Sequence, residues 1–197
     1  IKWYNKEGYL PVFVSEYTKD DVIYKIETFA NKHTVDNKDY VIDYSRVTAT
    51  NKSGEPRLLP VVSKNLIALN DEAAKTYTID PGATVVRDYA IEADKYEYFD
   101  ENVTEYTSLT SVQVIQQGSF DDNYRQMSAY WKTRLSELVD IDLPNKELVN
   151  AFKAGYIDTM IIKDKTYLHV GENGYARLYS HDTLGIMVQL LQSGDFQ

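Results

Sequence analysis

The chain has 197 residues, which is enough for one large core or for one domain and part of a second. Its 30 Asp and Glu residues outnumber its 21 Lys and Arg residues, and the formal net charge of −9 opposes binding to a phosphate backbone, so nucleic acid is not expected as a partner. The absence of cysteine excludes disulfides, thiolate catalysis and cysteine-ligated zinc, and no apolar run approaches the roughly 20 residues that span a bilayer.

Residues 1–118 are predicted to form an antiparallel β-sandwich. Short apolar or alternating segments recur there, and turn signals such as Asn51-Lys52-Ser53-Gly54 separate them about every ten residues. Asn31–Asp39 is polar and is predicted to be a loop, whereas Arg57–Leu59, bracketed by prolines, is predicted to be a connection or an edge strand. The expected strands are Leu10–Ser15, Val22–Phe29, Tyr40–Thr50, Val61–Leu69, Lys75–Ile79 and Thr84–Ala93, with one or two more within Asn102–Gln116.

The hydrophobic period becomes helical after Gly118. Apolar residues then follow helical spacing, which predicts a linker helix within residues 119–143. Pro144-Asn145 starts a second helix with a wide apolar stripe, and Lys163-Asp164-Lys165 ends it. The apolar positions of the linker helix are Tyr124, Met127, Trp131, Leu135, Leu138 and Val139.

The last part of the chain is predicted to be a loop followed by a buried helix. Asp182 is a candidate N-cap, because its carboxylate can accept hydrogen bonds from free backbone N–H groups, and Gly194 supplies the C-terminal stop. The apolar residues between them point in too many directions for a one-sided amphipathic helix, so we expect further elements to enclose it. These residues are Leu184, Ile186, Met187, Val188, Leu190 and Leu191. With the preceding helix, this segment makes one α/α hairpin over residues 144–197.

The sequence around this helix has a recognisable pattern. GYARLYSHD, from Gly174 to Asp182, precedes the helix, and Gly194-Asp195-Phe196 closes it. This arrangement resembles the entry to the first inner helix of six-hairpin α/α-toroid glycosidases, notably the glucoamylase-like group, over roughly the last quarter of the chain. In that group an aromatic Gly-Tyr loop leads to an Arg-Asp pair that binds sugar hydroxyls next to the cleaved bond. Asp182 matches the aspartate, whereas His181 stands where the family has arginine.

The resemblance implies a fold and a function. A large β-sandwich and a linker helix commonly precede the toroid in these enzymes, so we expect a mainly β chain: a sandwich, a linker helix and one hairpin of an incomplete α/α toroid. The remaining hairpins, with the general acid and base carboxylates, would then lie beyond Gln197, and the chain alone would be inactive. The implied partners are a carbohydrate substrate and the remainder of the same enzyme, a glycoside hydrolase that needs no cofactor.

The entry to the last helix is the expected substrate-binding site, with no catalytic residue of its own. Asp182 would accept hydrogen bonds from sugar hydroxyls, and an aromatic ring of the loop would stack on a pyranose face. Each candidate also has a plainer interpretation: a helix cap for Asp182, packing for the tyrosines and a surface position for the charged residues. The candidate site residues are Glu172, Tyr175, Arg177, Tyr179, His181 and Asp182.

Other residues near the pattern are not expected to belong to a site. Asp195 follows the helix stop and is predicted to be solvated or to cap the helix. His169 and His181 have no third ligand at a recognisable spacing, so no metal is expected.

Two other functions are left open by the sequence. One is a non-catalytic β-sandwich module that binds carbohydrate or protein, and the other is an inactive relative of the glycosidases. The chain starts at Ile1 without the features of a signal peptide, so we expect a removed targeting segment or an excised piece. A secreted or cell-surface location is slightly favoured over the cytoplasm.

Overall fold

The computed structural model describes residues 1–62, 65–93, 108–164, 167–171 and 179–196. The chain divides into two compact units. The first contains Ile1–Lys6 and most of the chain from Val12 to Met127, and the second contains Glu7–Pro11 and the chain from Ser128 onward. No helix in these described ranges combines the length and the apolar character that crossing a membrane requires.

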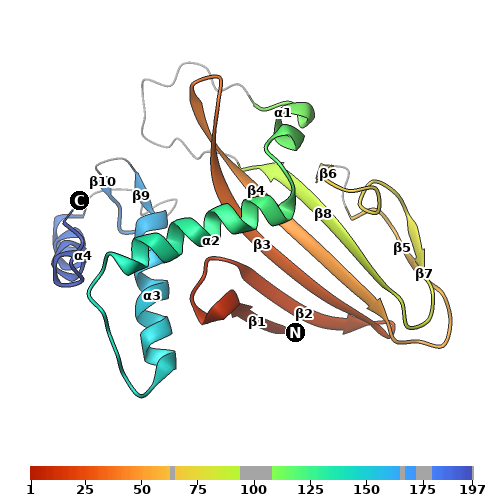
Figure 1. The fold of residues 1–197 in the computed structure, drawn as a ribbon, viewed down its shortest axis with the longest axis horizontal. Helices are drawn as coiled ribbons and strands as arrows, with labels where there is room; N and C mark the ends of the chain where they lie inside the picture. Colours follow the sequence, from red (N-terminus) through yellow and green to blue (C-terminus); the bar gives the residue numbers. More distant parts are fainter. Residues whose placement is uncertain (63–64, 94–107, 165–166, 172–178, 197) are drawn as a thin grey trace. The chain divides into compact units, whose positions relative to one another are not determined.

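The first unit is built on one six-stranded antiparallel sheet (Figure 1). Its strands are rich in Val, Ile, Thr and Tyr, whose branched or aromatic side chains suit a pleated surface. The predicted antiparallel character of this part of the chain is confirmed by the pairing of every neighbouring strand. In spatial order the strands are β1 (Lys2–Asn5), β2 (Phe13–Lys19), β3 (Val22–Val35), β4 (Lys38–Asn51), β8 (Thr84–Glu92) and β6 (Ile67–Ala68), with a short 3-10 turn, η1 (Lys6–Gly8), after β1.

Two tight turns set the register of β2, β3 and β4. Asp20-Asp21 joins β2 to β3, Asp36-Asn37 joins β3 to β4, and these four residues have positive φ between 50° and 62°. Two consecutive residues of positive φ make a type I′ turn, which matches the twist of paired strands and favours Asp and Asn. The second turn lies within Asn31–Asp39, so the loop predicted there is wrong. Both strands continue to the turn as a largely exposed hairpin.

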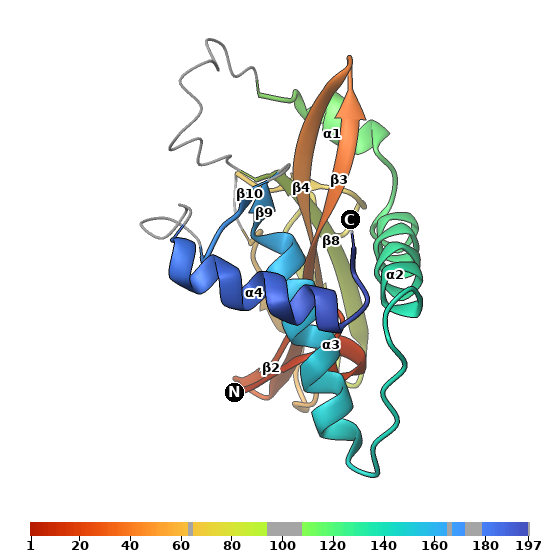
Figure 2. The same ribbon diagram turned by 90° about the vertical axis from the view of Figure 1, so that its left-hand side faces the viewer.

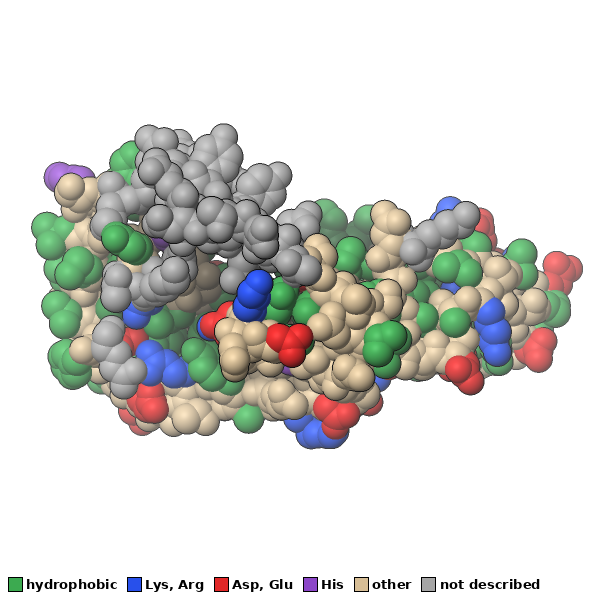
Figure 3. Space-filling model, turned by 90° about the horizontal axis from the view of Figure 1, so that it is seen from above, with side chains coloured by type: hydrophobic (Ala, Val, Ile, Leu, Met, Phe, Trp, Pro, Cys, Tyr) green, Lys and Arg blue, Asp and Glu red, His purple; other side chains and the backbone are tan. Residues whose placement is uncertain are grey.

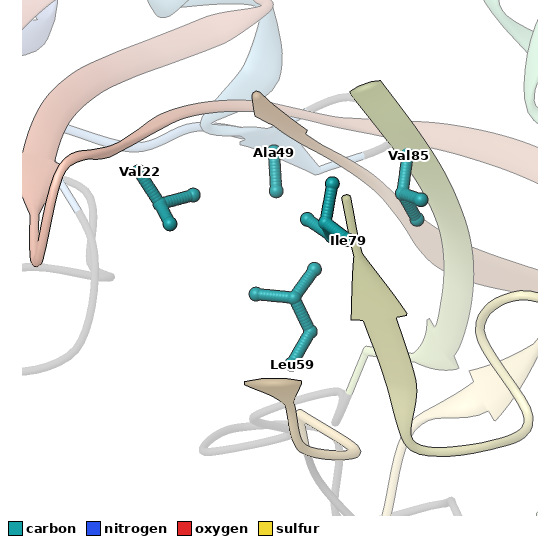
Figure 4. Packing of buried hydrophobic residues seen from close by; sticks show 5 residues of the cluster. All are labelled: Val22, Ala49, Leu59, Ile79 and Val85. Carbon is teal, nitrogen blue, oxygen red and sulfur yellow. The ribbon is translucent and has the colours of Figure 1, made fainter. Parts of the chain in front are cut away.

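A second layer of β structure covers part of one face of the sheet. β5 (Arg57–Leu59) pairs with β7 (Tyr77–Ile79), so the segment between the two prolines is an edge strand, one of the two predicted outcomes. The layers meet in a cluster of side chains that are each more than nine-tenths buried (Figure 4). The cluster consists of Leu59, Ile79, Val22, Ala49 and Val85. Two facing β layers give this unit its sandwich-like character.

Arg87 of β8 ties these layers together. Its guanidinium is buried and donates hydrogen bonds to the backbone oxygens of Leu59, Pro60 and Lys75 at 2.9, 2.6 and 3.0 Å. Burying a charge is costly unless its donors find acceptors. The three carbonyls therefore fix the path of the segment that carries β5 and leads to β7.

The opposite face of the sheet packs against the start of α2 (Phe120–Ser136). Phe29 of β3 lies at the centre of this contact, because side chains an odd number of positions from Val22 point to the other face. The centroid of its ring lies 5.5 Å from that of Tyr44, 5.1 Å from that of Phe120 and 6.0 Å from that of Tyr124. This aromatic cluster is the hydrophobic core on the helical side of the first unit.

A short helix replaces part of a predicted strand. α1 (Ser111–Gln116) falls within Asn102–Gln116, where Thr and Val residues favoured β structure. Thr110 and Gln113 form a reciprocal capping box, with the Gln113 amide donating to Thr110 Oγ1 at 3.2 Å and the Thr110 amide donating to Gln113 Oε1 at 3.0 Å. The strand prediction is wrong for Ser111–Gln116, since this cap favours a helix, and residues 102–107 lie outside the described part of the chain.

The second unit contains α3 (Lys146–Ile161) and α4 (Ser180–Gln192), with the short strands β9 (Lys163–Asp164) and β10 (Tyr167–Leu168) between them (Figure 2). Asn145 caps α3 by accepting a hydrogen bond from the Glu147 amide at 2.9 Å, which confirms the predicted start. Gly194 ends α4 as predicted, with a φ of 86°. The amides of Gly194 and Asp195 donate to the carbonyls of Leu191 and Leu190, the pattern of a Schellman motif.

Replacing Phe29 by alanine is expected to lower the free energy of unfolding by about 3 to 4 kcal/mol, because it empties the centre of the aromatic cluster. Ile23 lies on the same face of β3 but is 41% exposed, so Ile23→Ala is expected to cost less than about 1 kcal/mol. Urea unfolding of the two variants measures both values. Equal losses would show that the cluster around Phe29 is not a principal core.

Candidate functional site

Three of the six predicted site residues lie at the entry to α4, and all three are exposed: Tyr179, His181 and Asp182. The other three, Glu172, Tyr175 and Arg177, lie outside the described residues. Tyr179 occupies the N-cap of α4 without a side-chain hydrogen bond to the helix. Asp182 is therefore in the first turn, and its predicted position at the N-cap is wrong. Its carboxylate still benefits from the positive end of the helix dipole.

Thr183 anchors this first turn. It is the buried residue of α4, and its hydroxyl donates a hydrogen bond to the backbone oxygen of Leu168 on β10 at 3.3 Å. Neighbouring positions of a helix point about 100° apart. Burial of Thr183 on one side therefore leaves His181 and Asp182 directed to solvent, where an imidazole and a carboxylate are presented on one turn.

The described residues at the entry to α4 can bind a neutral polar ligand but do not form a hydrolytic centre by themselves. The carboxylate of Asp182 accepts hydrogen bonds, the imidazole of His181 can donate or accept one, and Tyr179 offers a ring and a hydroxyl. Glycoside hydrolysis requires two carboxyl groups on opposite sides of the bond that breaks. The described residues of this turn supply one.

The remainder of α4 exposes apolar side chains along its length. Leu184 is 62% exposed, and Met187, Val188 and Leu191 are all at least 45% exposed. Figure 3 shows hydrophobic side chains gathered at the left of the view, where α4 lies. The sequence predicts that other elements enclose this helix, and no described element covers these four side chains. A contiguous apolar surface of this kind marks a site of interaction.

Asp195, directly after α4, is buried and ion-paired. Its Oδ2 accepts hydrogen bonds from the hydroxyl of Tyr156 at 2.8 Å and from Nη2 of Arg134 at 3.1 Å. The prediction that Asp195 is solvated is therefore wrong, whereas its predicted capping role is confirmed at the backbone, where its amide donates to the carbonyl of Leu190. Its position in the Gly194-Asp195-Phe196 ending was the available sequence signal, but its partners come from 39 and 61 positions away in the chain.

This cluster joins three elements of the second unit. Arg134 belongs to α2, Tyr156 to α3, and Asp195 to the segment that follows α4. Burial and the hydrogen bond to Asp195 raise the pKa of Tyr156 to about 12, although the charge of Arg134 acts in the opposite direction. The three side chains thus hold the end of α4 in place by polar contacts.

A separate cavity of about 310 Å³ lies in the second unit. None of the three described site residues, Tyr179, His181 and Asp182, lines it. Two pairs of polar side chains lie on or beside its wall: Lys132 pairs with Glu7 at 2.9 Å, and the ammonium group of Lys153 lies 5.0 Å from the centre of the Tyr9 ring. Most of the remaining lining is apolar: Leu135, Leu138, Val139, Ile141, Val149 and Phe152. The cavity therefore combines polar and apolar surface in similar amounts.

Comparisons of the chain with protein-family models, with curated proteins and with solved structures found no match. Within the described ranges, no group of three or more His, Asp or Glu side chains could hold a metal ion. A functional conclusion therefore depends on the geometry at α4 and on the sequence pattern between Gly174 and Phe196.

Asp195→Ala is expected to lower the free energy of unfolding by about 3 kcal/mol, because Arg134 and Tyr156 lose a buried acceptor. Glu137 is the exposed partner of Arg134, at 2.9 Å, so Glu137→Ala is expected to cost less than about 1 kcal/mol. Denaturant unfolding of both variants tests this difference. A loss below 1 kcal/mol in Asp195→Ala would contradict the role given to the cluster.

The same cluster predicts a loss of stability at alkaline pH. The pKa of Tyr156 is raised from 10.0 to about 12, so the folded chain keeps a proton that the unfolded chain releases between these values. The stabilisation is complete below pH 10 and is lost as the pH rises towards 12. Free energies of unfolding measured across this range should fall less steeply for Tyr156→Phe than for the unsubstituted chain. Parallel pH profiles would exclude this contribution of Tyr156.

Proposed function

We propose that this chain is the N-terminal part of a glycoside hydrolase that acts on an oligo- or polysaccharide. One observation carries the proposal: α4 combines an exposed carboxylate in its first turn, Asp182, with exposed apolar side chains along the rest of the helix. This is the combination expected of the first inner helix of an α/α toroid before the other hairpins cover it. The sequence resemblance around Asp182 supports the same conclusion.

The apolar side of α4 determines the partner in this proposal. When another surface removes exposed leucine, valine and methionine side chains from water, the free energy falls by roughly 25 cal/mol for each Å² buried. Further helical hairpins of the same enzyme would bury Leu184, Met187, Val188 and Leu191. In this arrangement the sandwich-like sheet forms the N-terminal domain, α2 is the linker helix, and α3 with α4 forms the first hairpin.

Asp182 would act on the substrate by positioning it. Its carboxylate would accept hydrogen bonds from sugar hydroxyls next to the scissile bond, and correct placement of the reacting groups lowers the barrier of the reaction. His181, in place of the family's arginine, would supply a single donor instead of a fork of donors. Later hairpins would provide the chemical step, in which one carboxylic acid protonates the leaving oxygen while a second carboxylate attacks the sugar or activates water.

A non-catalytic module that binds carbohydrate is the alternative function. Exposed aromatic side chains on the sheet of the first unit favour it, with Trp3 at 68% exposed as the clearest case. In this alternative the exposed carboxylate of Asp182 has no part in sugar binding. The two functions therefore differ in the effect of changing that residue.

Binding of the isolated chain to a glycan array, followed by titration with the best oligosaccharide, is expected to depend on Asp182. Asp182→Asn should weaken binding about tenfold or more, because a hydrogen bond to a charged acceptor is worth roughly 1.5 to 3 kcal/mol. Asp142→Asn is the matched control, since this exposed carboxylate pairs with Lys146, the first residue of α3. Unchanged affinity in Asp182→Asn, for an oligosaccharide that still binds the Trp3→Ala chain, would remove Asp182 from the site and favour the binding module.

A further inference from the structure

Trp3 and Phe13 form a pair of exposed aromatic rings on the sheet of the first unit. Trp3 is 68% exposed and Phe13 is 50% exposed, and their ring centroids lie 6.4 Å apart with 42° between the ring planes. Trp3 comes from β1 and pairs with Ser15 of β2, two positions after Phe13. Both rings therefore lie on one face of the sheet, the face opposite Phe29, in the part that β5 and β7 leave uncovered.

Hydroxyl groups continue from this aromatic pair across the same face. Phe13 is the strand partner of Thr28 on β3, which is in turn the partner of Ser45 on β4. The hydroxyl oxygens of Thr28 and Ser45 lie 3.0 Å apart. Asp43, two positions before Ser45 and so on the same side of β4, adds a partly exposed carboxylate. Two rings, a hydroxyl pair and one carboxylate thus follow one another across four strands.

The chemistry of this face matches a sugar better than the other classes of ligand. A pyranose has an apolar side made of C–H groups and a rim of hydroxyls, which complement an aromatic ring and neighbouring hydroxyl groups respectively. Asp43 and the net charge of −9 oppose a polyanion. Adjacent strands lie about 4.8 Å apart, so the path from β1 to β4 covers roughly 14 Å, more than one sugar ring.

We propose that this face of the sheet is a carbohydrate-binding surface, on which a polysaccharide chain stacks against Trp3 and Phe13 and bonds to the hydroxyls of Thr28 and Ser45. The class of ligand rests on the proposed function, but the surface is a different site from Asp182. Its role is to hold the protein on an extended polymer, whereas Asp182 positions a sugar unit for cleavage.

Sedimentation of the purified chain with cellulose, chitin and starch granules tests this surface. Trp3→Ala and Phe13→Ala should each weaken binding to the retained polysaccharide about tenfold or more. Tyr4→Ala is the matched control, because Tyr4 is an exposed aromatic residue on the other face of β1, where its hydroxyl donates to Glu16 at 2.7 Å. Trp3→Phe keeps an aromatic ring and should retain most of the binding, which separates stacking from a folding defect.

The outcomes distinguish this surface from the site at α4. Loss of polysaccharide binding in Trp3→Ala with wild-type binding in Asp182→Asn supports the proposal, whether or not Asp182 binds soluble oligosaccharides. If the doubly substituted Trp3→Ala, Phe13→Ala chain sediments with the polysaccharide as the unsubstituted chain does, the proposal is overturned. It is also overturned if the unsubstituted chain binds none of the three polymers. A dimer that the Trp3→Ala change converts to a monomer, seen by light scattering, would also overturn it and assign the face to a second copy of the chain.

Discussion

The exposed apolar side of α4 is the constraint on which the functional account depends. A helix of this length is marginal in water by itself and takes most of its stability from tertiary packing. In the described part of the chain only one residue of α4, Thr183, is buried, whereas Leu184, Met187, Val188 and Leu191 remain exposed. The described part of the chain thus leaves the helix incompletely covered, and we propose that further hairpins of the same enzyme complete the coverage.

Polar contacts hold α4 at both ends, while apolar side chains between the two ends remain exposed. At the start, the hydroxyl of Thr183 bonds to the backbone of Leu168, and at the end Asp195 accepts hydrogen bonds from Tyr156 and Arg134. Directional bonds of this kind fix the position of α4 without an apolar partner. The first turn is therefore presented in a defined orientation, with Asp182 directed to solvent, as a site for a polar ligand requires.

The sequence predicted the regular parts of the fold well and the local exceptions poorly. Alternation identified most of the long strands because one face of each is buried, but it fails between Asn31 and Asp39, where both faces of the hairpin meet solvent. A capping box at Thr110 outweighed the β propensity of the residues after it. At the candidate site, the sequence pattern predicts Asp182 as a binding residue, and this stays a prediction, whereas the burial of Asp195 depends on partners far away in the chain.

The central claim is that α4 is an inner helix of an α/α toroid, on which further hairpins of the same enzyme pack. Hydrogen exchange of the backbone amides of α4 tests this claim most directly. Exchange rates for residues 184–192 would be compared between this chain and the product of the complete reading frame that encodes it. The account predicts that exchange in the complete product is slower by about a hundredfold or more, because packing of further hairpins raises the free energy of local opening by roughly 3 kcal/mol. Equal exchange rates in the two proteins, or a reading frame that stops at Gln197, would contradict it.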